Sequence, residues 1–328
     1  NLAIGQRRLS ILDLSPAGHQ PMTSPCGRYV LVYNGEIYNH IDIRVELESK
    51  LSGYPWRGHS DTEILLAALS HWGIESALPR LNGMFAFALW DLDKKTLTLA
   101  RDRLGEKPLY YGYCGNTFIF GSELKALKVH PKFKSNIDRN ALALFLRYGY
   151  VPTPYTIYED VFKLPPAHYL VINNSRKPSS HPICYWDLYN LINTRSAIEW
   201  HDEERVIDQF EERLKNVVSR RMISDVPLGG FLSGGLDSSL IVAMMQSQSA
   251  TPVKTFTVGF HEATHNEARF AHQVAAHLGT DHTELYVTPE EAMDVIPSLS
   301  TIYDEPFADS SQIPTLLISK LARESVTV

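Results

Sequence analysis

The residues best suited to chemistry form the run Leu-Ser-Gly-Gly-Leu-Asp-Ser-Ser at positions 232–239. An apolar stretch at 226–232 predicts a buried strand before this run, and apolar residues at 240, 241, 244 and 245 share one face of a helix after it. Glycines let a backbone approach an anion closely, and a helix N-terminus presents unpaired N–H groups to it. The order strand, glycine loop and helix therefore predicts an anion site, with hydroxyl donors from Ser233, Ser238 and Ser239.

Asp237 decides what kind of anion site this loop forms. A carboxylate repels phosphate unless a cation lies between them, so we interpret Asp237 as a ligand of Mg²⁺ that bridges to phosphate oxygens. No Gly-Lys-Ser/Thr sequence occurs in the chain, which excludes a P-loop of the common kind. The alternative is an ordinary glycine turn, which a bare Ser-Gly-Gly would favour. The full pattern, with Gly234 and Gly235 followed by Asp-Ser, resembles the pyrophosphate loop of the ATP-pyrophosphatase superfamily and implies ATP as the ligand.

Composition narrows the class of protein. The 328 residues suffice for two domains, and 44% hydrophobic and 21% charged residues are ordinary for a globular chain. A formal net charge of −6, without a long Lys/Arg run, argues against nucleic acid as a partner. We expect neither a membrane span nor a signal peptide. The scattered Cys26, Cys114 and Cys184 fit a reducing compartment, so a cytoplasmic location is expected.

The first half of the chain contains short strands and few helices. Apolar residues run almost without a break at 84–90, which predicts a strand buried on both faces, whereas alternation at 96–100 predicts one solvated face. Another strand is predicted at 29–33, and the Asn34-Gly35 pair after it is a strong turn signal. Ser60 and Glu63 form a capping-box pattern before an apolar helix face. These elements predict an α+β sandwich.

Four motifs of this half occur in the order seen in class II glutamine amidotransferases. They are Arg-Leu-Ser-Ile at 8–11, Asn-Gly-Glu-Ile-Tyr-Asn at 34–39, Ser-Asp-Thr-Glu at 60–63 and Arg-Asp-Arg-Leu-Gly-Glu-Lys-Pro-Leu-Tyr at 101–110. With the loop at 232–239 downstream, the chain resembles the glutamine-hydrolysing asparagine synthetase family over nearly its whole length. The resemblance implies an α+β amidotransferase sandwich of the N-terminal nucleophile type at 1–190 and an α/β doubly wound parallel-sheet synthetase domain at 200–328. We expect the start of the first domain and the end of the second to lie outside this sequence.

The resemblance implies a glutamine site, and each assignment has a physical basis. Arg8 would clamp the α-carboxylate of glutamine, because a guanidinium fork fits a carboxylate in a bidentate manner. Asp61 would pair with the α-ammonium. The Asn34 side chain and the Gly35 N–H would form the oxyanion hole, and Glu36 would help to hold the substrate. Taken singly, these residues have plainer interpretations as a hairpin turn, a first-turn helix charge and a surface arginine.

The nucleophile of that family has no counterpart in this sequence. It is a cysteine at the mature N-terminus whose own α-amino group acts as the base, whereas this chain begins with Asn1. Cys26 stands in a Ser-Pro-Cys-Gly-Arg turn that does not suit the role. Either the true start lies outside this sequence or the glutaminase is inactive, and we favour the first because the other motifs of the pocket are intact. No catalytic residue of the glutaminase is therefore identified.

Strands alternate with helices in the second half, which predicts a parallel sheet with its ligand at the carboxyl ends of the strands. The resemblance implies that Leu232 and Val258 flank adenine and ribose, with plain core residues as an equal alternative. His-Glu-Ala-Thr-His at 261–265 matches a zinc-peptidase pattern, but it directly follows a predicted strand, so we interpret it as a loop. For Asp304, Glu305 and Asp309, contact with a metal or acceptor and a solvated loop are equal interpretations.

These assignments together predict a carbon–nitrogen ligase that uses glutamine and ATP. The first domain would release ammonia from glutamine, and the second would activate a carboxylate as an acyl-adenylate, with Mg²⁺ at Asp237 and pyrophosphate leaving. Ammonia would then displace AMP, and aspartate is the expected acceptor. The expected partners are small molecules, and a homodimer is left open. The alternatives are another acceptor, such as a sugar uronic acid or a β-lactam precursor, a non-catalytic sensing homologue, and a zinc peptidase.

Overall fold

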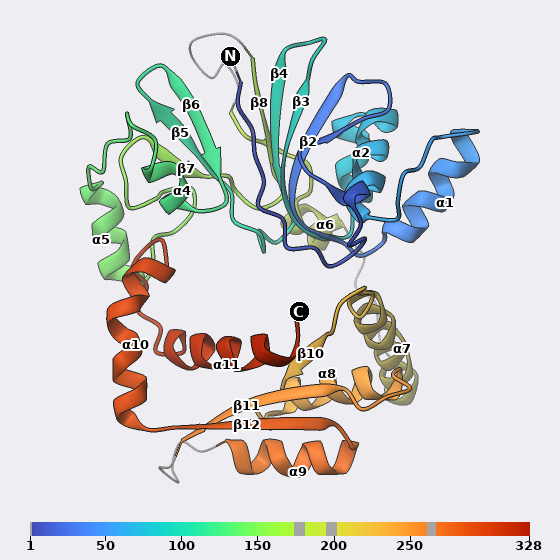
Figure 1. Cartoon of the computed structure of the whole chain (residues 1–328), viewed down its shortest axis with the longest axis vertical. Helices are drawn as coiled ribbons and strands as arrows, with labels where there is room; N and C mark the ends of the chain where they lie inside the picture. Colours follow the sequence, from blue (N-terminus) through green and yellow to red (C-terminus); the bar gives the residue numbers. More distant parts are fainter. Residues whose placement is uncertain (1, 174–180, 195–201, 261–266) are drawn as a thin grey trace. The chain divides into compact units, whose positions relative to one another are not determined.

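The computed structural model describes residues 2–173, 181–194, 202–260 and 267–328. The chain divides into two compact units (Figure 1). The first consists of Asn1–Ser196 together with the short segment Tyr303–Ala308. The second consists of Ala197–Ile302 and Asp309–Val328. Each unit has β-sheets of its own.

The first unit contains two antiparallel sheets, with strand orders β1-β2-β3-β4-β8-β9 and β6-β5-β7. The larger sheet consists of β1 (Met22–Thr23), β2 (Tyr29–Ile37), β3 (Gly83–Asp91), β4 (Thr96–Arg101), β8 (His168–Ile172) and β9 (Ile183–Cys184). The smaller sheet consists of β5 (Tyr110–Cys114), β6 (Thr117–Gly121) and β7 (Val161–Lys163). The α-helices are α1 (His40–Lys50), α2 (Asp61–Trp72), α3 (Ile74–Ala77), α4 (Leu124–Lys128), α5 (Arg139–Tyr148) and α6 (Leu188–Thr194), and 3-10 helices span Pro16–Gly18 and Leu78–Arg80.

The larger sheet is buried on both faces. On one face, Leu31 and Phe85 pack with Leu65 of α2 in the main core cluster. On the other face, Leu99 of β4 packs with Leu109 and with aromatic residues of the smaller sheet. Figure 1 shows these layers, with α2 on one side of the larger sheet and β5, β6 and β7 on the other. The predicted α+β sandwich and the two-sided burial of β3 are thus confirmed.

Two predictions for these strands are wrong. Thr98 and Leu99 are both buried, since the helical layer covers the face of β4 that alternation assigned to solvent. The pair Asn34-Gly35 forms no turn, because β2 continues through both residues in antiparallel pairing with β3. Gly35 has φ +154°, and a Cβ on it would lie 2.1 Å from the carbonyl oxygen of Met84. Glycine is required at position 35 because two strands approach closely, and not because the chain turns there.

Helix α2 begins where the capping pattern predicts. The Oγ of Ser60 accepts a hydrogen bond from the N–H of Glu63 at 3.3 Å, which confirms Ser60 as the N-cap. The Glu63 carboxylate accepts instead from the N–H groups of Arg57 and Gly58, each at 3.0 Å. The loop before α2 is thereby fixed to the first turn of the helix, which also carries Asp61.

Asp102 organises the turn between β4 and β5. Its buried carboxylate accepts hydrogen bonds from four backbone N–H groups at 2.9–3.1 Å, those of Phe85, Leu104, Glu106 and Lys107. Asp102→Asn replaces one acceptor oxygen by an amide that faces N–H donors. We expect a loss of about 2 kcal/mol in the free energy of unfolding, measured by urea denaturation. The exposed Asp160→Asn is the control, and equal midpoints for the two variants would contradict this role.

The second unit has a parallel three-stranded sheet in the order β10-β11-β12, as the alternation of strands and helices predicts. The strands are β10 (Gly229–Phe231), β11 (Lys254–Phe260) and β12 (Asp281–Val287). The helices are α7 (Glu203–Arg221), α8 (Leu236–Ser247), α9 (Ala268–Leu278), α10 (Pro289–Ile302) and α11 (Gln312–Ser325).

Helices cover both faces of the parallel sheet. A Cβ on Gly229 would approach Val326, just after α11, whereas a Cβ on Gly230 would approach Val242 and Met245 of α8. Figure 1 shows α9 and α11 on opposite sides of β11 and β12. The doubly wound α/β arrangement is thus confirmed. The carbonyl of Val328 accepts a hydrogen bond from Gly229 N–H at 2.9 Å, so the last residues lie along β10.

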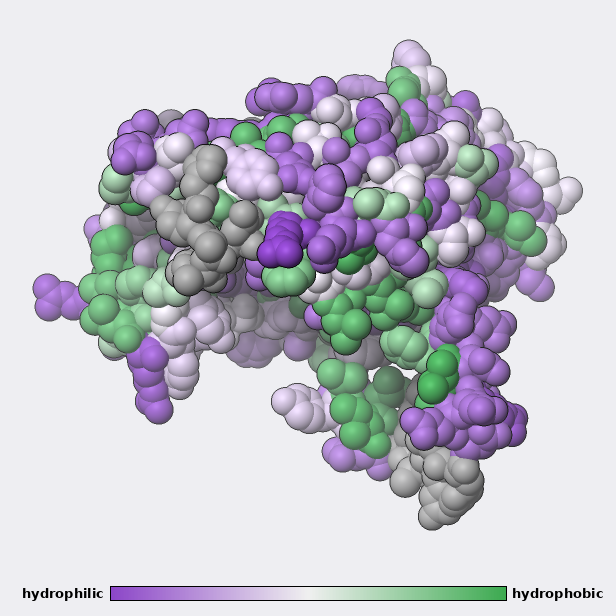
Figure 2. Space-filling view, turned by 90° about the horizontal axis from the view of Figure 1, so that it is seen from below, coloured by the Kyte–Doolittle hydropathy of each residue, from purple (hydrophilic) through white to green (hydrophobic). Residues whose placement is uncertain are grey.

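The surface mixes polar and apolar side chains, as the face in Figure 2 shows. Large hydrophobic residues reach the surface in both units, among them Leu146 on α5, Phe210 on α7 and Leu236 on α8. Scattered exposure of this kind is ordinary for folded proteins. Among the described residues, no helix combines the length and apolar character that crossing a bilayer demands.

We expect His282 of β12 to make the stability of the second unit sensitive to pH. Its Nδ1 lies 2.8 Å from Thr255 Oγ1, and its buried Nε2 has no hydrogen-bond partner among the described residues. Burial lowers the pKa of His282, although the Glu284 carboxylate opposes this effect. The unfolded chain therefore binds the proton more tightly, so stability is complete above about pH 6.5 and falls below it. Urea midpoints between pH 7.5 and 5.5 should fall less in His282→Gln than in the parent, and parallel curves would contradict this.

Candidate functional site

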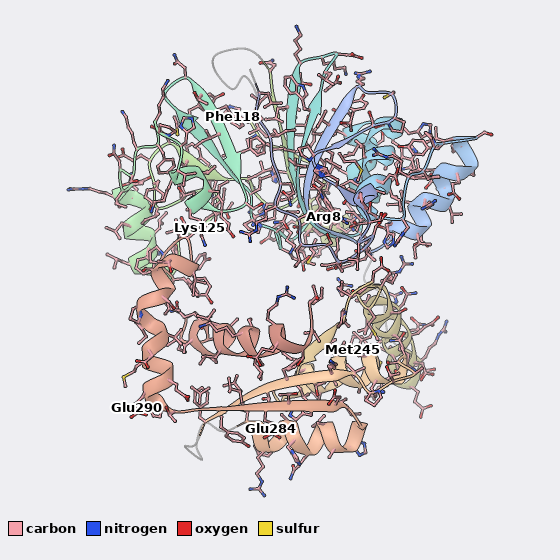
Figure 3. All side chains as sticks on the ribbon, viewed as in Figure 1. Arg8, Phe118, Lys125, Met245, Glu284 and Glu290 are labelled. Atoms are coloured by element: carbon pink, nitrogen blue, oxygen red, sulfur yellow. The ribbon has the colours of Figure 1, made fainter. Side chains whose placement is uncertain are left out.

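Arg8 lies at the centre of the first candidate site (Figure 3). It lines a cavity of about 340 Å³ together with Gln6, Ser10, Leu14, Ser15, Pro16, His19 and Gln20. Its Nη1 and Nη2 donate hydrogen bonds to the carbonyl oxygens of Asp13 at 3.0 Å and Leu12 at 2.5 Å. A Cβ on Gly18 would lie 2.3 Å from Nη1, so the guanidinium rests directly on that glycine. Arg8 is thus fixed by the backbone beside a cavity, which is a suitable position for binding a carboxylate.

Asp61 is buried at the first turn of α2. Its Oδ2 accepts hydrogen bonds from Tyr33 Oη at 2.7 Å and from Ile37 N–H at 3.0 Å. Burial raises the pKa of Asp61 and that of Tyr33 as well. The side chain is inside the fold and lies in the first turn of α2, as the interpretation as a first-turn helix charge has it. Its pairing with an α-ammonium stays a prediction.

Gln20 connects the cavity of Arg8 with the strand that leads to Asn34. Its Oε1 accepts a hydrogen bond from Tyr33 N–H at 2.7 Å, and its Nε2 lies 3.5 Å from Thr62 Oγ1, next to Asp61. Asn34 Nδ2 donates to Ser122 Oγ at 3.3 Å. Asn34, Gly35 and Glu36 follow in β2 and are partly exposed. They and Asp61 do not line the cavity of Arg8 itself, so the oxyanion-hole assignment also stays a prediction.

The second candidate site is the loop between β10 and α8. Gly234 has φ +78°, and a Cβ on it would lie 2.6 Å from the backbone nitrogen of Ala271, so only glycine fits. The hydroxyls of Ser233 and Ser238 lie 2.8 Å apart, and Ser233 Oγ accepts from the N–H of Gly235 at 3.3 Å. Gly235 is the N-cap of α8, and Asp237 is exposed in the first turn. The loop therefore has the strand, glycine turn and helix N-terminus that the sequence predicts.

The residues of this loop fit a phosphate group with a cation. Ser239 Oγ is buried without a hydrogen-bond partner among the described residues, and it lies in the first turn of α8, where a bound oxyanion would give it one. The exposed Asp237 carboxylate beside it could hold Mg²⁺. No group of three or more metal-ligating side chains occurs in the described ranges, so a cation here would share its coordination with phosphate and water. Leu232 is 1% exposed and packs with Val242, whereas Val258 is partly exposed.

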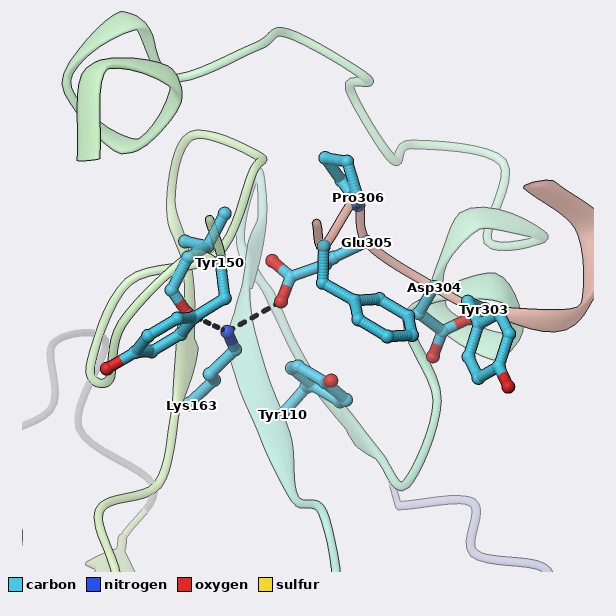
Figure 4. Close-up of a pocket in the computed structure, with 9 residues that line it drawn as sticks. Tyr110, Tyr150, Lys163, Tyr303, Asp304, Glu305 and Pro306 are labelled. Carbon is cyan, nitrogen blue, oxygen red and sulfur yellow. Dashed lines mark hydrogen bonds and ion pairs between the residues drawn. The ribbon is translucent and has the colours of Figure 1, made fainter. Parts of the chain in front are cut away.

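The interpretation of Asp304 and Glu305 as parts of a solvated loop is wrong, whereas their contact with a metal or acceptor stays a prediction. Asp304 accepts hydrogen bonds from the N–H groups of Leu124 at 2.6 Å and Lys125 at 3.2 Å, at the start of α4. Glu305 accepts from Ile157 N–H at 2.7 Å and pairs with Lys163 Nζ at 2.6 Å (Figure 4). Both carboxylates thus anchor this segment within the first unit. Asp309 is exposed, and its carboxylate accepts from Ser311 N–H.

Two further candidates from the sequence, the pentad at 261–265 and Cys26, stay untested. The pentad at 261–265 lies outside the described residues. Cys26 is exposed, with its Sγ 3.2 Å from Ser24 Oγ, in the turn that leads to β2. The residues that sequence reasoning missed are Asp13, Gln20 and Tyr33, which support Arg8 and Asp61 from within the fold. The position of Asp13 five residues after Arg8 gave no signal of this contact.

Comparison with known proteins gives a consistent result. The model of the glutamine amidotransferase domain matches residues 1–186, and that of asparagine synthase matches residues 209–328. A putative glutamine-hydrolysing asparagine synthetase of Methanocaldococcus jannaschii is 36% identical over the whole chain and 64% of its own length. Asparagine synthetase 1 of Bacillus subtilis is also 36% identical, over the whole chain and 50% of its own length. An amidase of Gibberella zeae, chry2, is 32% identical over 89% of this chain and 44% of its own. The chain thus spans roughly half the length of these relatives.

Proposed function

We propose a function that starts from one premise: this chain belongs to the glutamine amidotransferase domain family. It converts a carboxylate to an amide, with ammonia from glutamine and energy from ATP. Aspartate is the proposed acceptor and asparagine the product, in line with the names of the relatives from M. jannaschii and B. subtilis. The observation that carries the proposal is that one chain holds both an arginine-lined cavity and a glycine loop at a helix N-terminus.

In the glutaminase half, which we assign to residues 1–190, substrate recognition rests on opposite charges. Arg8 binds the α-carboxylate and Asp61 the α-ammonium, and Glu36 contributes further contacts. The Asn34 amide and the Gly35 N–H stabilise the oxyanion that develops when the side-chain amide of glutamine is attacked. Ammonia and glutamate are the products of this half-reaction.

In the synthetase half, which we assign to residues 200–328, the loop at 232–239 binds the pyrophosphate part of ATP. Backbone N–H groups and the hydroxyls of Ser233, Ser238 and Ser239 donate to phosphate oxygens, and Val258 and the main chain of Leu232 lie beside the nucleoside. Mg²⁺ held by Asp237 would neutralise charge on the leaving pyrophosphate. The acceptor carboxylate is joined to AMP, and ammonia then displaces AMP to give the amide.

The cysteines and the net charge of the protein bear on its cellular compartment and on its partners. The three cysteines are free, and two of them are exposed, so we propose a reducing compartment and a cytoplasmic location. The proposed partners are small molecules and not nucleic acid, given the net charge of −6. A homodimer remains an outcome to be measured by light scattering.

The test of the proposed function follows all products at once. Protein produced from its reading frame is incubated with ATP, Mg²⁺, glutamine and aspartate, and asparagine, AMP and pyrophosphate are measured by mass spectrometry. Asparagine formed together with pyrophosphate supports the proposal. Glutamate without pyrophosphate would direct attention to another acceptor, such as a sugar uronic acid, and the absence of all turnover would favour a sensing role.

Asp237→Asn tests the nucleotide half separately. Removal of the charge should weaken Mg²⁺-dependent binding of ATP at least tenfold, or about 1.4 kcal/mol, because Asn is a poorer ligand of Mg²⁺. Titration calorimetry with and without Mg²⁺ measures the effect. The control is Asp208→Asn, an exposed position on α7 of the same unit. Equal ATP affinities for the two variants would contradict the role of Asp237 as a ligand of Mg²⁺ in this site.

A further inference from the structure

Asp13 has an unusual backbone conformation for its residue type. Its φ is +60°, in the left-handed region that non-glycine residues seldom adopt, and the residue is 1% exposed. Such a conformation costs about 1 kcal/mol or more and persists where the surrounding contacts fix it. The contacts of Asp13 should therefore show what the conformation is for.

Those contacts join three parts of the first unit. The carbonyl oxygen of Asp13 accepts a hydrogen bond from Arg8 Nη1 at 3.0 Å. Its Oδ1 accepts from the N–H and the hydroxyl of Ser15, at 3.1 and 2.5 Å. Its Oδ2 accepts from His59 N–H at 3.0 Å, two residues before Asp61. One buried residue thus connects the arginine, the wall of its cavity and the loop that starts α2.

The fit around the carboxylate is close. A Cβ on Gly58 would lie 2.0 Å from Asp13 Oδ2, so this position of the loop has no room for a side chain. Asp13 does not line the cavity itself, which excludes direct contact with a ligand there. Its effect on a ligand would be exerted through Arg8 on one side and through α2 on the other.

We propose that Asp13 is a positioning residue that fixes the spacing between Arg8 and Asp61, and thereby selects an α-amino acid over ligands that carry only one of its two charges. The inference rests on the proposed glutamine site. The carboxylate and the ammonium group of an α-amino acid are attached to the same carbon atom. They can therefore be bound together only if Arg8 and Asp61 are held at a fixed separation. Asp13 holds both through a single side chain and its own carbonyl.

Two variants test this by different means. Asp13→Asn replaces an acceptor by an amide donor, and Gly58→Ala keeps the charge but displaces the carboxylate from His59. Asp160→Asn is the matched control, since Asp160 also has φ +60° but is exposed and bonded to neither segment. Titration calorimetry is done with L-glutamine, with glutaramic acid, which lacks the α-ammonium, and with 4-aminobutanamide, which lacks the α-carboxylate. Melting temperatures show that each variant is folded.

We expect Asp13→Asn and Gly58→Ala to lower the affinity for glutamine at least tenfold. The affinity for each analogue should change less than threefold, so the preference for glutamine over the analogues becomes smaller. The control should bind all three ligands like the parent. Unchanged affinity for glutamine, or equal losses for all three ligands, would overturn the positioning role and leave the proposed function intact. If the parent itself fails to bind glutamine, the proposed function falls, and this inference falls with it. Should Asp13→Asn fail to fold, Gly58→Ala and Ser15→Ala carry the same comparison.

Discussion

Gly35→Ala should destabilise the first unit by about 4 kcal/mol, because backbone strain and overpacking add. The strain arises because φ is +154°, a region that is almost exclusive to glycine. The overpacking arises because the new Cβ would lie 2.1 Å from Met84 O and 2.7 Å from Phe85 Cα, which are backbone atoms of β3. The strand pair would have to separate at the point where Asn34 and Gly35 are proposed to bind the oxyanion.

Urea denaturation measures the stability of this variant, and calorimetry measures its affinity for glutamine. Gly53→Ala is the matched control, since Gly53 has φ +74° but nothing within 4 Å of the position of a Cβ. The control isolates the backbone strain and should cost about 1 kcal/mol. If the two variants unfold at the same urea concentration, the close approach of β2 and β3 is not what requires glycine at position 35.

Gly35 also shows how far sequence reasoning reaches in this fold. The sequence places the motifs at 34–39 and 60–63 in a strand-rich α+β unit, and it predicts the capping by Ser60 because that contact depends on residues three apart. The turn at Asn34-Gly35 was wrong because local turn chemistry competes with pairing to β3, a strand about 50 residues away in the sequence. The solvated face of β4 was wrong for the same reason, since a pattern within one strand does not show what covers it.

Long-range polar contacts were missed for a related reason. The hydrogen bond from Leu124 N–H to Asp304 joins residues 180 positions apart, and no spacing rule connects them. By contrast, the glycine loop before α8 was placed correctly because strand, loop and helix are consecutive. Asp13 combines both cases: its hydrogen bonds to Ser15 are local, but its contact with His59 depends on the fold.

Glu305→Gln should lower the free energy of unfolding of the first unit by about 3 kcal/mol, the cost of breaking an ion pair that is largely shielded from water. The side chains of Lys163 and Glu305 are only 15% and 11% exposed, and Lys163 Nζ also donates to Val151 O at 2.6 Å. Without the carboxylate, the ammonium group of Lys163 keeps its desolvation cost but loses its counter-charge. The neutral amide can still accept from Ile157 N–H, so the loss reflects mainly the charge pair.

The expected consequence is release of Tyr303–Ala308 from the first unit. Chymotrypsin, which cleaves after aromatic residues, should then cut at Tyr303 or Phe307 faster than in the parent, since these residues line the same pocket as Lys163. Glu290→Gln, an exposed position on α10, is the control. In the double variant Lys163→Met, Glu305→Gln, much of the stability should return, because neither charge remains and the amide still accepts from Ile157 N–H. If Glu305→Gln alone leaves both stability and cleavage unchanged, the segment is held by its other contacts. The hydrogen bonds from the N–H groups of α4 to Asp304 would be the first of these to examine.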